Sequence, residues 1–563
     1  MQGGETSFLG KGTLLLLGHN CAILGETGSI CKTGSDFMKT LYFGGAILSM
    51  EEQKPVESLL VEEGRILALG NLDEVVPLAQ GATRVNLEGR ALLPAFVDGH
   101  SHITALAQTL GLCQLDGCNS LQEVGQRLKA FRERWQIPTG EWVIGFGYDQ
   151  NQLEEGCHPT AAVLDAFLPD CPAMVTHASG HMGAVNSLGM QKLGITANTP
   201  DPEGGKIGRL PDGSPNGYLE EAAFTNMGSR IPRDQSEGLK NLQRAQEVYF
   251  SQGITTIHEG LTRQPEWDLL QAAASQGLLR GDVAAYIDIK DSAALLEEHR
   301  DFLGHYRNRL KIAGYKLFLD GSPQGRTAWM THPYLEGEPD YRGYPVYQDQ
   351  EVLGFLEKAQ REQVQIVTHC NGDAAAEQLL RCYEKAYKEY GNPIRPVMIH
   401  AQLLRPNQVP RLRELGMIAS FFVAHVYHWG DIHVKNFGWE RASQISPTKT
   451  ALENNVVFDF HQDSPVIPPN MMETLWCAVC RRTKAGKVLG ENQRLTPWEA
   501  LQAITKNAAY ALFEEGEKGT LAPGKRADLV VLDRNPLSCP PDELRDIQVV
   551  ETIKDGETVY TAH

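Results

Sequence analysis

The sequence predicts an α/β protein, because apolar runs of strand length alternate with helical stretches through the middle of its 563 residues. Eight such runs can be counted, which indicates a TIM-type (β/α)8 barrel of parallel strands. Strand-and-turn patterns at both ends of the chain predict a small β-sandwich domain built from both termini. Further strand-like runs between the first two barrel units predict a large insertion after the first barrel strand.

The two ends of the chain carry the predicted β-domain. Short strand-like runs separated by Gly and Asp turns occupy residues 38–91, and a similar pattern returns in residues 515–563. A β-domain assembled from both segments would bury their apolar side chains together. Residues 1–37 are rich in Gly, Ser and Thr and lack sustained periodicity, so we expect a poorly ordered N-terminal extension there.

The predicted barrel spans residues 92–514. Its eight apolar runs end near His102, His258, Asp288, Asp320, His369, His400, Val423 and Asp463. The active site of such a barrel lies at the C-terminal ends of its strands, so polar residues at these ends are the first candidates for function.

The predicted insertion spans residues 104–250 and contains two strand-like runs, residues 141–150 and 172–180. A Gly- and Pro-rich stretch follows over residues 199–217. We expect this stretch to be a long loop without regular structure, and loops of that length are usually functional or disordered.

Composition narrows the classes of partner and the compartment. Lys and Arg total 52 against 70 Asp and Glu, and no basic run stands out, so nucleic acid is not expected as a partner. The longest early apolar run, TLLLLG, is far shorter than the ~20 residues of a membrane span, and no charged leader surrounds it. Eleven scattered cysteines fit reduced thiols. We therefore expect a cytoplasmic protein without a membrane contact.

The stretch LLPAFVDGHSHI places two histidines at the end of an apolar run. Alternate residues of a strand share one face, so His100 and His102 would point the same way and could bind one metal ion. The alternative is a pair of solvated histidines at a strand end. Further ligands at other strand ends would decide between these interpretations.

Four further polar residues end other predicted strands. They are Lys316 in YKLFLDGS, His369 in THCNGD, His400 in MIHAQ and Asp463 in HQDSPV. Each has an alternative structural role: a buried lysine can pair with a carboxylate, a histidine can be a satisfied core residue, and an aspartate can cap a turn. Together with the His-x-His pair they form a combination that is far more specific than its parts.

These motifs resemble those of the amidohydrolase superfamily, in particular amidohydrolase family 3, the YtcJ-like group that includes N-substituted formamide deformylase. The resemblance covers nearly all of residues 38–563. It rests on LLPAFVDGHSH, DPEGGKIGRLPDGSPNGYLEEAA, GITTIHEG, YKLFLDGS, THCNGDAA, MIHAQ, FFVAHVYHWGD, HQDSPVIPP and KGTLAPGKRADLVVLD.

The resemblance implies a set of metal ligands. His100, His102 and Asp463 would bind the more buried metal, and His369 and His400 the more exposed one. Lys316 would bridge both as an N6-carboxylysine, an anion that can hold two cations that an ammonium would repel. Zinc is the expected metal, with one or two ions per chain, although iron, manganese or cobalt would suit similar ligands.

The expected activity is hydrolysis of a non-peptide C–N bond in a small amide, an N-substituted formamide or a cyclic amide. A bound divalent cation lowers the pKa of water from about 15.7 towards ~7 and polarises a carbonyl. Asp463 is the expected catalytic residue, because a carboxylate beside the attacking water can take its proton and pass it to the departing nitrogen. In HQDSPV, Gln462 replaces the Asn or Ser of many relatives, which puts the surroundings of Asp463 in doubt.

The resemblance also suggests residues that contact substrate. His425, His428 and Trp429 follow the seventh predicted strand, and the alternative for them is loop packing. His181 lies in the insertion, which resembles the family's substrate-covering domain. Asp320 lies four residues beyond Lys316 and could line the same opening; its alternative is a turn cap.

Two other function classes remain open. A metal-dependent lyase or isomerase could use the same ligands, since one barrel supports many reactions. A metal-free binding protein would be expected to have lost ligands, whereas all six are present. We expect a small-molecule substrate and a homo-oligomer, with a dimer as the first expectation.

Overall fold

The computed structural model describes residues 39–150, 152–177, 182–202, 205–228, 235–336 and 338–562. The predicted N-terminal extension, residues 1–37, lies outside these ranges. Within them, no helix is long and apolar enough to cross a membrane.

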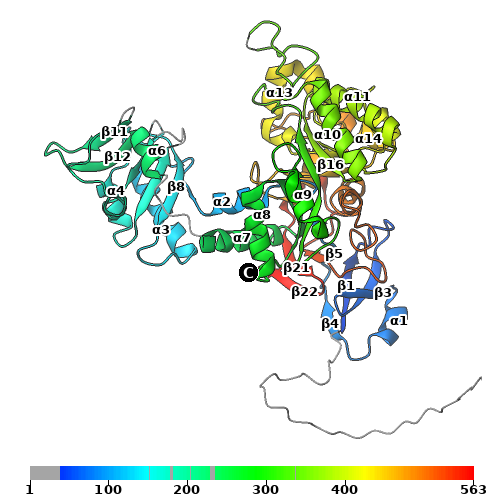
Figure 1. Ribbon diagram of the computed structural model, residues 1–563. Helices are drawn as coiled ribbons and strands as arrows, with labels where there is room; N and C mark the ends of the chain where they lie inside the picture. The colour runs from blue at the N-terminus through cyan, green and yellow to red at the C-terminus, as the bar shows by residue number, and fades with distance from the viewer. Residues whose placement is uncertain are drawn as a thin grey trace, which may run out of the picture. The chain divides into compact units, whose positions relative to one another are not determined.

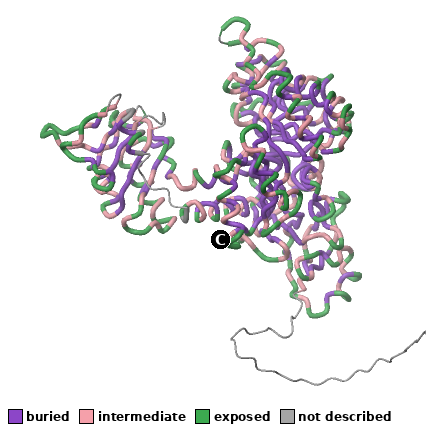
Figure 2. Tube along the Cα trace, in the orientation of Figure 1, coloured by how far each residue is buried: buried purple, intermediate pink, exposed green. Residues whose placement is uncertain are grey.

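Eight parallel strands form one curled sheet (Figure 1). In chain order they are β6 (Phe96–Val97), β13 (Ile254–Thr262), β14 (Asp282–Asp288), β15 (Leu310–Phe318), β16 (Ile366–Cys370), β17 (Val397–His400), β18 (Ile418–Phe421) and β19 (Phe458–Phe460). Most of their residues are buried (Figure 2), and all those of β14 are. Burial on both faces is why these strands read as apolar runs. The predicted barrel-like α/β fold is confirmed.

Helices connect and follow these strands. They are α2 (Ile103–Leu110), α7 (Gln235–Phe250), α8 (Gln264–Ser275), α9 (Ala294–Glu298), α10 (Asp349–Glu362), α11 (Asp373–Tyr390), α12 (Val409–Glu414), α13 (His425–Ala442), α14 (Thr448–Glu453), α15 (Met471–Cys480), α16 (Pro497–Ala503) and α17 (Lys506–Ala511), with 3-10 turns η2 (Arg300–Phe302) and η3 (Glu491–Gln493). In α10 the buried residues Val352, Leu356 and Ala359 recur at helical spacing, so one face packs on the sheet.

The first barrel strand is shorter than the sequence predicts, because β6 ends at Val97 and both histidines of the His-x-His pair lie in the following loop. Loop hydrogen bonds hold this segment against the end of β19. The N–H of Asp463 donates to His100 O at 3.1 Å, and the N–H of His102 donates to Ser464 O at 2.8 Å. The backbone that carries the two imidazoles is therefore positioned by the loop after β19 and not by the pleat of β6.

Strands from both ends of the chain join in one mixed sheet, as predicted for the terminal β-domain. Its strands are β1 (Lys39–Ile47), β2 (Val56–Glu62), β3 (Arg65–Gly70), β4 (Thr83–Asn86), β5 (Ala91–Pro94), β20 (Leu529–Leu532), β21 (Val549–Lys554) and β22 (Glu557–Thr561), with α1 (Leu72–Val75), η1 (Val76–Leu78) and η4 (Pro541–Asp546) between them. The junction is the antiparallel pair of β5 and β20, in which Leu92 lies opposite Val531. Both residues belong to one apolar core.

Buried ion pairs tie the C-terminal segment to the barrel strands. Lys518 Nζ lies 2.6 Å from Asp282 Oδ2 and 2.8 Å from Glu514 Oε2. Glu514 also pairs with Lys311, and Lys554 Nζ lies 3.1 Å from Asp282 Oδ2. All five side chains are buried, so each charge depends on its partners. These contacts give the charged residues near the C-terminus a structural role.

The insertion carries a third sheet, which confirms the predicted insertion after the first barrel strand. Its strands are β7 (Cys113–Gln114), β8 (Val143–Tyr148), β9 (Ala173–His177), β10 (Met182–Val185), β11 (Gly205–Arg209) and β12 (Pro215–Glu221), and its helices are α3 (Leu121–Arg134), α4 (Ala161–Phe167), α5 (Ser187–Leu193) and α6 (Ala222–Gly228). The predicted runs 141–150 and 172–180 contain β8 and β9.

The prediction of an irregular loop over residues 199–217 is wrong in part, because β11 and β12 form an antiparallel pair there. Ile207 lies opposite Leu219, and both pack with Phe224 in one buried cluster. The Gly and Pro residues that suggested a loop lie mainly at the turn and at the strand ends. Two short strands with few apolar residues gave too weak an alternation to be detected.

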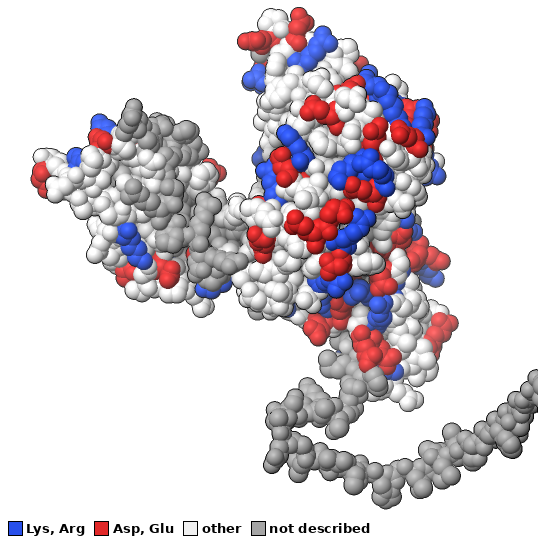
Figure 3. Space-filling model, viewed as in Figure 1, with Lys and Arg blue, Asp and Glu red and all other residues white. Residues whose placement is uncertain are grey.

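Charged side chains are interspersed on the surface. Figure 3 shows acidic and basic residues mixed over the visible face of the barrel, without a broad area of one sign. Such a mixed surface offers no continuous basic track for a phosphate backbone on that face.

Candidate metal centre

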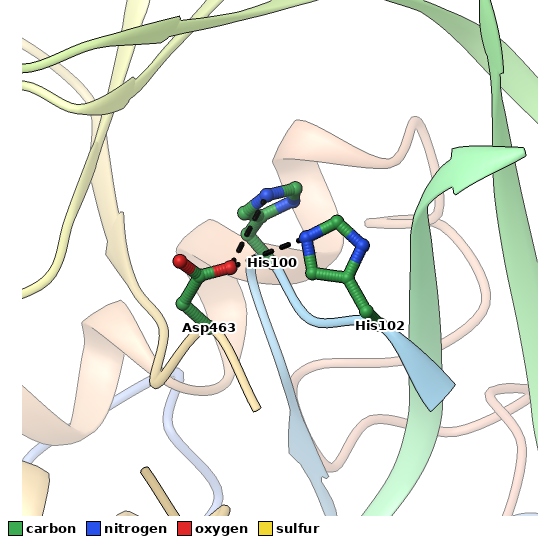
Figure 4. Close-up of side chains that lie close together, drawn as sticks. All are labelled: His100, His102 and Asp463. Atoms are coloured by element: carbon green, nitrogen blue, oxygen red, sulfur yellow. Dashed lines mark ion pairs between the residues drawn. The ribbon is translucent and has the colours of Figure 1, made fainter. Parts of the chain in front are cut away.

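Three polar side chains converge where β6 and β19 end (Figure 4). Asp463 Oδ1 lies 3.6 Å from His100 Nε2 and 3.3 Å from His102 Nε2. One donor atom of each residue lies within 4.8 Å of the others. Two imidazole nitrogens and a carboxylate oxygen at this spacing form a candidate site for a divalent metal.

The electrostatics of these donors fit a divalent cation. Asp463 Oδ1 is buried, and the nitrogens of His102 and His100 are its charged or polar neighbours. Burial would raise the pKa of Asp463, but the hydrogen bond with His102 and the neighbouring histidines hold this pKa well below its ordinary value. Burial would lower the pKa of His102, yet Asp463 and Glu259 raise it to about 9. A cation would replace the proton that His102 holds beside Asp463.

His100 and Lys316 form the most buried part of the cluster. Lys316 comes from β15, and its Nζ lies 3.0 Å from His100 Nε2. Burial lowers the pKa of His100 well below its ordinary value, so its ring is neutral. Burial, opposed by Asp463, lowers the pKa of Lys316 to about 7. A lysine with this pKa is partly a free amine at neutral pH, which is the form that can react with carbon dioxide.

The strands β16 and β17 bring His369 and His400 to the same cluster. His400 Nε2 lies 3.0 Å from His369 Nδ1 and 3.9 Å from Asp463 Oδ2. Burial lowers the pKa of His369 to about 4 and that of His400 well below its ordinary value, so both rings are neutral near pH 7. All six predicted metal ligands are thus connected in space, and their role as ligands stays a prediction.

Glu259 on β13 is a contact of the site that the sequence did not reveal. Its Oε1 lies 3.5 Å from His102 Nδ1, and its Oε2 accepts a hydrogen bond from Thr104 N at 2.9 Å. The ring of His102 is therefore held at both nitrogens, by Glu259 on one side and Asp463 on the other. Carboxylates that bind the second nitrogen of a metal-binding histidine orient its ring. A polar residue directly after the predicted strand end at His258 was the available signal.

His461 is a second residue that sequence reasoning missed. Its Nε2 lies 3.0 Å from His400 Nδ1, and its Nδ1 lies 2.8 Å from Ser420 Oγ. Gln462, where the motif departs from many relatives, donates a hydrogen bond from Nε2 to Thr474 Oγ1 at 2.8 Å. Gln462, the residue that differs from many relatives, therefore contacts α15 and not Asp463.

The carboxylate of Asp320 is already engaged. It is buried and accepts hydrogen bonds from the backbone N–H groups of Trp329, Asn371 and Gly372 at 3.0, 2.9 and 2.7 Å. These contacts match the capping alternative and fix the loop after β15 beside the start of α11. A contact between Asp320 and substrate stays a prediction.

The three candidates after the seventh strand lie on the first turns of α13. His425 Nδ1 lies 3.2 Å from His433 Nε2, and the rings of His425 and Trp429 are 4.5 Å apart. His428 Nε2 lies 2.8 Å from Glu473 Oε1. The segment is a helix and not a loop, and these side chains pack within α13 and against Glu473 of α15; their contact with substrate stays a prediction. The fifth candidate, His181, lies outside the described residues.

Comparison with known proteins identifies the family. A sequence profile of the amidohydrolase family matches residues 83–560. YtcJ of Bacillus subtilis is 28% identical over 553 residues, covering 93% of this chain and 99% of the relative. N-substituted formamide deformylase of Arthrobacter pascens is 28% identical over 527 residues, covering 90% and 95%. The crystal structure of an uncharacterised metal-dependent hydrolase from Pyrococcus furiosus matches with a TM-score of 0.70 at 27% identity, covering 89% of this chain and 100% of that one. The chain belongs to the amidohydrolase family.

Proposed function

We propose that this chain is a divalent-metal hydrolase that cleaves a non-peptide C–N bond in a small amide, an N-substituted formamide or a cyclic amide. The convergence of His100, His102 and Asp463 carries the proposal, because these donors face one another at the barrel end where such enzymes bind substrate. The substrate class is suggested by the relative named N-substituted formamide deformylase, which aligns along 90% of this chain.

The proposed metal is zinc, and we propose two ions per chain. The proposed ligands are His100, His102, Lys316, His369, His400 and Asp463. Nitrogen and carboxylate donors suit zinc. The ammonium form of Lys316, 3.0 Å from His100 Nε2, would be repelled by a cation, whereas a carbamate is an anion that would attract it, so we propose the carbamate form in the loaded enzyme.

The chemistry divides between the cation and the chain. A bound divalent cation supplies a water of lowered pKa and polarises the substrate carbonyl. Asp463 takes the proton of the attacking water and passes it to the departing nitrogen. The low pKa of Asp463 keeps this carboxylate ionised at neutral pH. His428, held by Glu473, and Trp429 are proposed to orient the substrate.

Zinc-loaded protein should be assayed against N-substituted formamides, small linear amides and cyclic amides in water labelled with heavy oxygen. Hydrolysis should release an amine and a carboxylate that contains one solvent oxygen or, from a cyclic amide, one molecule that carries both groups. Asp463→Asn should lose most turnover while the protein stays folded. Product without solvent oxygen would instead identify a lyase or isomerase, and a fully loaded enzyme inactive on all three classes would refute the proposed substrates.

A further inference from the structure

A chain of hydrogen-bonding side chains runs from the candidate centre into the barrel interior. His400 Nδ1 faces His461 Nε2 at 3.0 Å, and His461 Nδ1 faces Ser420 Oγ at 2.8 Å. Ser420 on β18 lies in register with Asp459 on β19. All four side chains are at most 3% exposed. Water therefore does not compete for these contacts.

The polarity of this chain follows from the nitrogen of His400 that faces the centre. His400 Nε2 lies 3.9 Å from Asp463 Oδ2 and 3.0 Å from His369 Nδ1, so Nε2 is the nitrogen that a cation in the centre would bind. A neutral imidazole that binds a cation through one nitrogen carries its proton on the other.

The same reasoning extends inward. A neutral His400 with an unprotonated Nε2 carries its proton on Nδ1 and donates it to His461 Nε2. His461 then carries its proton on Nδ1 and donates to Ser420 Oγ. The Ser420 hydroxyl can in turn donate to Asp459, which is its partner in register on the next strand. Both carboxylate oxygens of Asp459 are buried and lack a hydrogen-bond partner among the described residues, so an acceptor is available at the inner end.

The opposite polarity is incompatible with a cation on His400. If Ser420 donated to His461 Nδ1, both ring protons would shift to the other nitrogen, and His400 would carry its proton on Nε2. A protonated Nε2 cannot bind a cation, so the first polarity is the one that metal binding requires.

We propose that His461 and Ser420 are positioning residues that hold His400 in the tautomer with its proton on Nδ1. Nε2 of His400 then keeps its lone pair and faces the centre, 3.9 Å from Asp463 Oδ2, ready to bind a divalent cation. The inference rests on the proposed function in taking a divalent cation as the ligand of His400. Neither residue touches substrate.

The test measures zinc affinity of the purified full-length chain by competition with a chelator. His461→Phe keeps a ring of similar size and removes both nitrogens. It should weaken zinc binding roughly 10- to 100-fold, the usual effect of removing a partner of a metal-binding histidine. His461→Gln places an amide oxygen near the former Nε2 and should restore most of the affinity. Ser420→Ala should weaken binding less than His461→Phe.

The matched control is His258→Phe. His258 is another buried barrel histidine, and neither of its ring nitrogens has a hydrogen-bond partner among the described residues. This substitution disturbs the interior without touching His400, so it should leave zinc affinity within about threefold of the unmodified chain. Thermal unfolding of the metal-free proteins shows which variants are folded.

The outcomes distinguish a failure of the positioning role of His461 and Ser420 from a failure of the proposed function. Unchanged zinc affinity in folded His461→Phe would overturn the positioning role of His461. So would a His461→Gln variant that binds zinc as weakly as His461→Phe. If His461→Phe does not fold, Ser420→Ala decides, and unchanged affinity there would overturn the role of Ser420 and with it the proposed polarity. An unmodified chain that binds no divalent metal would refute the metal-hydrolase proposal itself.

Discussion

A single added methyl group at Gly260 should disrupt the metal centre. Gly260 lies on β13 directly against the ring of His100, and a Cβ there would lie 2.2 Å from His100 Cε1 and 2.7 Å from Nδ1. Ordinary contacts of a Cβ begin near 3.4 Å, so the ring must retreat by about 1.2 Å. His100 Nε2 would then lose its present position 3.6 Å from Asp463 Oδ1. A site displaced by about 1 Å no longer holds its ligands in productive geometry.

The expected effect of Gly260→Ala is roughly a 100-fold loss of kcat/KM, the scale associated with a misplacement of about 1 Å. Overpacking should also lower the free energy of unfolding by about 1–3 kcal/mol. Zinc affinity, turnover and urea unfolding should be compared with Gly354→Ala in α10, where an added Cβ meets nothing within 4 Å. That control should be neutral or slightly stabilising, because alanine favours helices. Native zinc affinity and turnover in folded Gly260→Ala would refute the packing argument.

Three further results are expected. Glu259→Gln should weaken zinc binding roughly tenfold with little change in unfolding temperature, because it removes the charge that orients His102; an unchanged dissociation constant would contradict this. Elemental analysis should give two zinc ions per chain and a sharp fall in Lys316→Ala, whereas one ion in both proteins would remove Lys316 from the site. Burial opposes ionisation of Glu514, but Lys518 and Lys311 lower its pKa from 4.5 to about 2. Its contribution to stability, about 3 kcal/mol, is present above pH 4.5 and lost towards pH 2. Urea unfolding across this range should therefore show a smaller acid loss in Glu514→Gln.

The barrel and the meeting of the candidate ligands at one of its ends could be predicted because their signals are local. Parallel strands buried on both faces leave near-continuous apolar runs, and the change from apolar to polar residues marks each strand end. The runs ending at His369 and His400 coincide with the ends of β16 and β17. Since parallel strands present their C-terminal ends at one edge, polar residues at successive ends meet even when they lie far apart in the sequence.

The partners of these ligands could not be predicted, because their roles depend on contacts between distant segments. Glu259 meets Thr104, 155 residues away, and His461 meets His400, 61 residues away. Neither residue looks different from an ordinary polar residue at a strand end. The loop that carries His102 is likewise held by Ser464, which follows the last barrel strand, so the residue pattern of the short strand β6 contained no information about this contact.

The backbone at this end of the barrel is strained at two candidate ligands. His400 has φ of 70° and Asp463 has φ of 53°, in the left-handed region that residues with a Cβ rarely adopt. Such conformations cost roughly 1–3 kcal/mol each and persist only where the surroundings fix them. At Asp463 the N–H donates to His100 O at 3.1 Å, and beyond His400 the N–H of Ala401 donates to Cys370 O at 3.0 Å. Both strained residues are candidate ligands, and both are held by hydrogen bonds to segments that carry other candidate ligands. Such strain is expected where the geometry of a binding site matters more than the stability of the fold.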